Sequence, residues 1–225
     1  MIDLPPAPAR IARLPKDRRG YPVPWFLEWM KDGNPASPND AGAQPDFRII
    51  KYRAREHAWI KKFCWICGEP MGVHRVYVIG PMCVVNRTTM EPPCHRDCAE
   101  YAAKACPFLV RPRMRRLPQD DLVFASGGLR IDGEMIPRNP GACCLYEARD
   151  ATPFRDGKGG WLIRLGAPAR VDWWAQGRQA THDEIFESIT SGLPNLVELA
   201  ELEGPEAKAE LARLTVQALK LLPAA

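Results

Sequence analysis

Four residues near the middle of the chain have the types and the spacing of metal ligands. Cys64 and Cys67 are separated by two residues, and so are His95 and Cys98. Thiolate sulfur and imidazole nitrogen are the atoms that a tetrahedral Zn²⁺ takes from proteins, and two such pairs at a hairpin-length separation are typical of a small zinc-stabilised fold. We therefore predict a structural zinc site whose ligands are these four residues.

The identity of one ligand is ambiguous. Cys94 adjoins His95 and could replace it as the ligand, in a Cys-x3-Cys pair with Cys98. His95 is favoured, since a two-residue spacing within one helical turn places both ligands on the same side of the helix. His74 is isolated and is predicted to be a surface or hydrogen-bonded residue. The remaining cysteines have no partner at ligand spacing and are predicted to be small buried side chains: Cys83, Cys106, Cys143 and Cys144.

The flanking sequence predicts the elements that would position these ligands. A helix over 53–62 leads to Cys64, and Gly68 supplies backbone freedom just after Cys67. The β-rich run 73–79 and the short run 82–85 are predicted to form a hairpin. The alanine-rich run 95–104 is predicted to be a helix that ends before Pro107.

A Cys-x-x-Cys turn, a hairpin and a helix with the second ligand pair in its first turn resemble the treble-clef zinc finger, over about a fifth of the chain. This resemblance implies the same ligands: Cys64, Cys67, His95 and Cys98. The wider series Gly-Pro-Met at 80–82, Asn-Arg at 86–87 and Ala-Cys-Pro-Phe-Leu at 105–109 is also similar to sequences of bacterial and phage-borne proteins. That second similarity implies a compact zinc module in a small cytoplasmic protein and brings no activity with it.

Catalysis is not indicated by these motifs, and we name no catalytic residue. Four protein ligands close the zinc shell, whereas a hydrolytic zinc keeps one position for water. A nucleobase deaminase needs a downstream Pro-Cys-x-x-Cys, and the run 140–144 has the wrong spacing. Nucleases also use the treble clef, so a divergent metal-dependent nuclease that uses His74 and Asn86 is kept as an alternative.

Arginine is concentrated just after the predicted zinc module. Four arginines occur within six positions, and guanidinium groups suit phosphate oxygens. A net charge of +4 permits an acidic partner without requiring one. The preferred prediction is a zinc-stabilised binding protein that contacts DNA or RNA. The contacts would be made by four side chains: Arg111, Arg113, Arg115 and Arg116. The competing interpretation is that this segment is a solvated linker.

The N-terminal 24 residues combine six prolines with five basic residues and are predicted to be an extended arm. This arm could lie along phosphates, but packing on its own domain is favoured. Together with Trp25 and Phe26 it could also dock on a host or phage protein. An adaptor or inhibitor is therefore the second alternative function.

The rest of the chain predicts a small antiparallel sheet followed by helices. Strand-like runs at 122–124, 129–131, 142–146 and 161–165 are separated by glycine-rich turns. Trp173 and Trp174 could stack on bases but are favoured as core residues. Thr181 and Glu184 predict a capping box at a helix start, and the terminal helix is predicted to close the core in preference to pairing with a second copy.

Composition and length agree with an α+β protein. The 225 residues include 23 prolines and 17 glycines, which favours many short elements. Eight cysteines without an apparent export signal or membrane span predict a cytoplasmic protein with no membrane partner. We predict an extended Pro/Arg-rich arm and loop over 1–46, the treble-clef-like module over 47–110, a small β-sheet region over 111–180 and C-terminal helices over 181–225.

Overall fold

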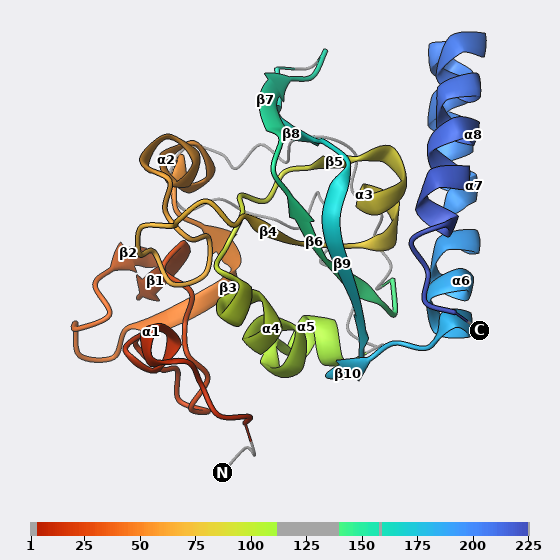
Figure 1. The fold of residues 1–225 in the computed structure, drawn as a ribbon. Helices are drawn as coiled ribbons and strands as arrows, with labels where there is room; N and C mark the ends of the chain where they lie inside the picture. Colours follow the sequence, from red (N-terminus) through yellow and green to blue (C-terminus); the bar gives the residue numbers. More distant parts are fainter. Residues whose placement is uncertain (1–3, 112–139, 158, 225) are drawn as a thin grey trace.

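The computed structural model describes residues 4–111, 140–157 and 159–224 (Figure 1). Helices and antiparallel sheets are mixed along the chain, as the α+β prediction requires. The elements are α1 (Ala9–Ala12), β1 (Leu27–Lys31), β2 (Asn34–Ala36), β3 (Gln44–Ile50), α2 (Ala54–Lys61), β4 (Val76–Ile79), α3 (Pro81–Asn86), β5 (Thr88–Thr89), α4 (Arg96–Ala105), α5 (Pro107–Val110), β6 (Cys143–Ala148), β7 (Ala151–Arg155), β8 (Trp161–Leu165), β9 (Pro168–Ala175), β10 (Arg178–Gln179), α6 (His182–Thr190), α7 (Leu193–Glu203) and α8 (Pro205–Leu219).

A four-stranded antiparallel sheet in the order β10-β9-β6-β4 lies between two layers. Its side chains alternate between two hydrophobic clusters, because successive residues of a strand point to opposite faces. Leu145 and Trp174 belong to the cluster that contains Cys64 and Cys98. The neighbouring residues Cys144, Tyr146 and Trp173 belong to the other cluster. Burial on both faces explains why β6 is apolar almost throughout.

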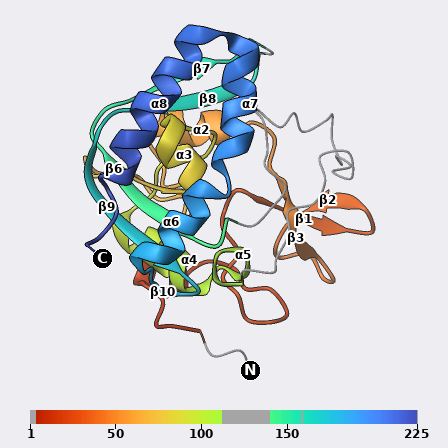
Figure 2. The ribbon, with the colours of Figure 1, turned by 90° about the vertical axis from the view of Figure 1, so that its right-hand side faces the viewer.

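Helix α4 contacts β4 and β6 on the first face, and α3 contacts β6 on the second. The C-terminal helices cover α3 from outside, as Figure 2 shows, and α8 packs against both α3 and α7. A second sheet, in the order β5-β8-β7, adds Ile163 and Leu165 to the second cluster. Ala218 of α8 is buried there as well, so the terminal helix contributes to this core.

Arg96, the first residue of α4, ties this helix to the central sheet. Its guanidinium group donates to Asp172 on β9 and to Glu147 on β6, each at 2.7 Å. These contacts hold the pKa of the Glu147 carboxyl below its ordinary value, with a smaller contribution from His74. The helix that carries His95 and Cys98 is therefore fixed to the sheet by charge as well as by packing.

The N-terminal segment packs on its own chain. Ile11 is buried in the cluster around Cys64 and Cys98. Arg10 donates to Asp97, and both Arg10 and Arg13 form ion pairs with Glu69. This arrangement agrees with the favoured interpretation of the arm. A third sheet in the order β2-β1-β3 follows it, and β2 lies within a segment whose composition indicated a loop.

The predicted hairpin is wrong at its second strand, because the run 82–85 lies within α3. Gly80 precedes this helix in an extended conformation, and Pro81 occupies its first turn. Proline is well suited to that position, since its missing N–H would have no helical partner there. The predicted strands at 122–124 and 129–131 lie outside the described residues. No helix among the described residues is both long and apolar enough to cross a bilayer.

Candidate metal centre

The two predicted ligand pairs meet in the structure. The sulfur atoms of Cys64, Cys67 and Cys98 and a ring nitrogen of His95 all lie within 4.8 Å of one another. The His95 Nδ1 atom is 3.5 Å from the Cys67 sulfur and 3.9 Å from the Cys98 sulfur. A tetrahedral zinc with ordinary bond lengths would separate sulfur and nitrogen ligands by about 3.6 Å. The four side chains thus form a group that can hold a metal ion.

The turn that carries Cys64 and Cys67 is set by backbone hydrogen bonds. Gly68 N–H donates to the Cys64 carbonyl at 2.9 Å, and Cys64 N–H donates to the Glu69 carbonyl at 2.8 Å. The Cys64 sulfur in turn accepts a hydrogen bond from the backbone N–H of His95. Such bonds favour the charged thiolate, which is the form that binds metals.

Gly68 has φ +76°, a left-handed conformation that side chains other than glycine rarely adopt. A Cβ atom at this position would lie 2.9 Å from the Cγ atom of Trp25. The glycine is therefore required both by the backbone of the turn and by the close approach of this indole ring.

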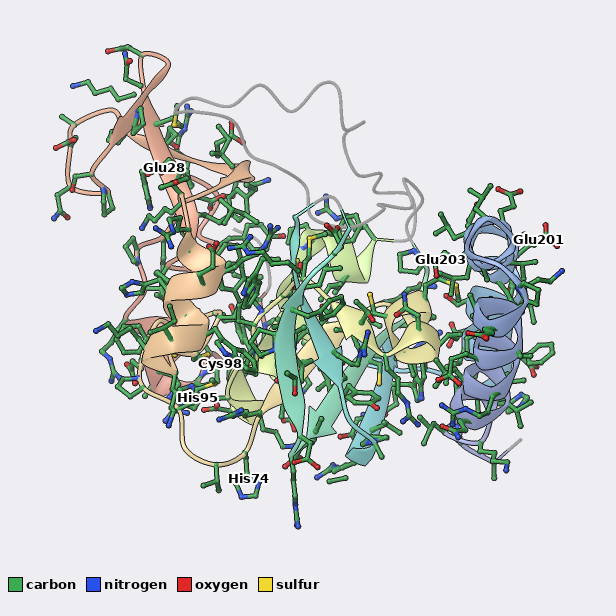
Figure 3. The ribbon with its side chains drawn as sticks, turned by 90° about the horizontal axis from the view of Figure 1, so that it is seen from above. Glu28, His74, His95, Cys98, Glu201 and Glu203 are labelled. Atoms are coloured by element: carbon green, nitrogen blue, oxygen red, sulfur yellow. The ribbon has the colours of Figure 1, made fainter. Side chains whose placement is uncertain are left out.

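His95 is positioned by two contacts at the start of α4. Its backbone N–H donates to the Cys64 sulfur at 3.4 Å, and its Nε2 atom lies 3.1 Å from the Pro70 carbonyl oxygen. A carbonyl only accepts hydrogen bonds, so this contact places the ring proton on Nε2 and leaves the lone pair of Nδ1 facing the sulfurs. Figure 3 labels His95 beside Cys98, from the first turn of the same helix.

Cys94 has a different role from its neighbour. Its thiol donates to the Val76 carbonyl at 3.1 Å, and its backbone pairs with Val76 in an antiparallel bridge. Burial raises the pKa of this thiol well above its ordinary value. Cys94 therefore joins the ligand region to the edge of β4, while His95 supplies the fourth ligand atom of the group.

The three clustered sulfurs strongly affect one another's ionisation. Hydrogen bonds from the Cys67 and Cys98 thiols lower the pKa of Cys64. The same contacts raise the pKa of Cys67 and of Cys98, in each case with the Cys64 interaction as the largest cause. Three adjacent thiolates can carry charge together only beside a cation, which is the chemistry of a bound metal.

Trp25 and Phe26 hold the cysteine turn in place, a role that the sequence did not indicate. The Trp25 indole N–H donates to the Cys64 carbonyl at 2.9 Å. The Phe26 ring stacks on Trp65 with a centroid separation of 4.0 Å. No local motif marks these residues, because they lie about forty positions before the turn that they contact. Because both rings contact residues of the same chain, these contacts do not support a role in docking to another protein.

The residues named for a nuclease have structural contacts. His74 is largely exposed, and its Nδ1 atom lies 2.8 Å from a carboxylate oxygen of Glu147. The Asn86 side chain accepts a hydrogen bond from Thr88 N–H at 2.9 Å and so stabilises the turn after α3. Neither belongs to the group formed by the three cysteines and His95.

Of the predicted arginine cluster, Arg111 is exposed directly after α5. Arg113, Arg115 and Arg116 lie outside the described residues. Trp173 and Trp174 are both buried, on opposite faces of the central sheet. This agrees with the prediction that they are core residues, which was favoured over stacking on bases.

Comparison of the chain with protein-family models, with curated proteins and with solved structures gave no match. The similarity to bacterial and phage-borne proteins and the treble-clef assignment therefore remain predictions, and the site is interpreted from its own geometry.

Proposed function

We propose that this chain is a zinc-stabilised binding protein that contacts nucleic acid. The observation that carries the zinc part of the proposal is the closed group of four ligand atoms: the sulfurs of Cys64, Cys67 and Cys98, and the Nδ1 atom of His95. Sulfur-rich groups with one imidazole suit Zn²⁺ better than Mg²⁺ or Ca²⁺, which prefer oxygen ligands.

The position of this group supports a structural role. Cys64 and Cys98 are fully buried, and all four ligand positions of a tetrahedral metal are supplied by the protein. The group lies where the end of α2, the start of α4 and the N-terminal arm converge. A metal at this point would bind these separate segments together and stabilise the fold.

Nucleic-acid binding is proposed from the arginines at 111, 113, 115 and 116. Arg111 is exposed at the end of α5, a short helix separated from α4 by the extended residue Cys106. Guanidinium groups in close succession can each engage a phosphate, and the chain has a net charge of +4. The partner is proposed to be DNA or RNA, in preference to a protein.

Two measurements test the two parts of this proposal. Native mass spectrometry with elemental analysis should find one zinc per chain, and a protein that folds fully without bound metal would contradict the structural role. The zinc-loaded protein should bind labelled oligonucleotides with an affinity that falls steeply with salt. No binding to single- or double-stranded DNA or RNA at low salt would overturn the nucleic-acid part.

A further inference from the structure

Helix α2 and its flanking residues carry an unusual excess of positive charge. Residues 47–62 contain six lysines and arginines and one acidic residue, Glu56. Arg53, Lys61 and Lys62 are exposed. Among the described residues, no ion pair or side-chain hydrogen bond engages any of these three groups.

Three of the five basic residues of the N-terminal arm are already paired with carboxylates. Arg10 pairs with Asp97, Arg13 with Glu69 and Arg19 with Asp17. A cation that is already paired gains less from a phosphate, because its existing partner must first be displaced. The cations of α2 are accordingly better placed to bind an anionic partner than those of the arm.

The same surface exposes apolar side chains among the cations. Tyr52 is 75% exposed next to Arg53, and Ile60 is 70% exposed next to Lys61. Positions 57, 60 and 61 follow helical spacing and share the outer side of α2, while the exposed Arg53 and Lys62 cap its two ends. A freely accessible aromatic ring beside unpaired cations is the combination that binds single-stranded nucleic acid, in which bases stack on the ring and phosphates contact the cations.

Charge is also distributed unequally over the whole molecule. The segment 181–225 contains eight acidic and three basic residues. Its helices lie on the opposite side of the molecule from α2, and Figure 3 labels Glu201 and Glu203 there (Figures 1 and 3). A polyanion is repelled by this acidic side and attracted to the side that carries α2, so the field of the protein would orient its approach.

We infer that the exposed side of α2 is an interface for single-stranded nucleic acid, in which Arg53, Lys61 and Lys62 contact phosphates and Tyr52 stacks on a base. This inference rests on the proposed nucleic-acid function and adds a second surface to it. The metal centre supports the interface, because the carbonyl of Lys62 accepts a hydrogen bond from Met71 N–H across the cysteine turn.

The test compares charge-matched variants of the zinc-loaded full chain in a salt titration against labelled oligo(dT) and oligo(U). The triple variant Arg53→Gln, Lys61→Gln, Lys62→Gln removes the α2 cations. The matched control Arg149→Gln, Arg155→Gln, Lys220→Gln removes three exposed cations from other elements. Because each lost phosphate contact lowers the log–log salt slope by about 0.7 on single strands, the α2 variant should lose about 2 units of slope and about a hundredfold in affinity at 0.1 M salt.

A second pair of variants tests the stacking contact. Tyr52→Ala should weaken binding by about tenfold, while Tyr52→Phe keeps the ring and should retain the affinity. Neither change should affect folding, since Tyr52 is largely exposed.

The failures of the two proposals are distinguishable. Absence of binding by the unmodified protein would contradict the nucleic-acid function as a whole. Salt-dependent binding that the α2 variant retains, but that is lost when the arginines at 111, 113, 115 and 116 are replaced by glutamine, would overturn only the α2 interface. Equal binding of duplex and single strand without any effect of Tyr52→Ala would also overturn it.

Discussion

At the scale of single residues, the contrast between Cys94 and His95 shows what ligand spacing can decide. Both residues precede α4, and both could be counted as ligands from the sequence. Backbone pairing with Val76 directs the Cys94 thiol to a carbonyl, and His95 is then the residue that enters the helix beside the sulfurs. The two-residue spacing to Cys98 correctly favours His95. The reason that Cys94 is excluded is its pairing with a strand eighteen positions away, which no local spacing encodes.

The two kinds of cysteine should respond differently to substitution. Cys67→Ser is expected to reduce bound zinc well below one per chain and to lower stability by about 4 kcal/mol, hence the melting temperature by about 10 °C. Cys94→Ala should keep one zinc per chain, because the Cys94 thiol donates to the Val76 carbonyl and is not one of the four clustered ligands. Elemental analysis after gel filtration checks both, and zinc loss from the Cys94 variant would contradict the ligand set.

Gly68 gives a second test of the cysteine turn. Gly68→Ala forces a methyl group into a left-handed conformation and against the Trp25 ring, so stability should fall by about 2 kcal/mol or more. Gly72→Ala is a matched control, because a Cβ atom there meets nothing within 4 Å. Urea unfolding of the zinc-loaded variants measures the difference. Equal midpoints for the two variants would show that the close approach to Trp25 is not required.

At the scale of elements, the sequence predicted those whose ends are marked by side chains. The capping box at α6 is confirmed, since Thr181 accepts from Glu184 N–H and the Glu184 carboxylate accepts from Thr181 N–H. The run 82–85 was misread because its β-branched residues suit a strand, whereas Gly80 and Pro81 start a helix. The covering of the central sheet by α4 and α3 depends on long-range contacts and could not be predicted from any one segment.

Glu184 makes this capping contribution dependent on pH. Its pKa is lowered to about 2, chiefly by the hydrogen bond from Arg178 and also by that from Thr181. A carboxyl whose pKa falls on folding stabilises the protein above its unfolded pKa of about 4.5, and the effect is lost as pH falls toward 2. Solvent exposure limits its size to about 1 kcal/mol.

The variant Glu184→Gln should therefore be less stable than the unmodified protein by about 1 kcal/mol at pH 7, and this difference should shrink below pH 4. Glu187→Gln, an exposed change on the same helix, serves as the control for altered net charge. Urea unfolding at both pH values measures the difference between proteins, so metal loss common to all three in acid cancels. A stability difference that does not change with pH would contradict the role assigned to the Glu184 carboxylate.

At the scale of the whole molecule, the central sheet separates two cores that share its strands. One core contains the cysteine group, α4 and the N-terminal arm, and the other contains α3, the second sheet and the C-terminal helices. Arg96 joins α4 to the sheet by charged contacts on the first face. Stability of the two cores should consequently be coupled through the sheet but not identical.

Metal removal should reveal this division. Chelation is expected to speed amide hydrogen exchange most in α2, the cysteine turn and the start of α4, because these three segments meet at the four clustered ligands. The amides of Ile185 and Ile189 in α6 should change least, because both side chains lie in the core on the far face of the sheet. Exchange with and without chelator, followed by mass spectrometry, measures both regions at once. Uniform acceleration throughout the described chain would instead show that the metal supports a single cooperative unit, and unchanged exchange near Cys64 would argue against a structural metal.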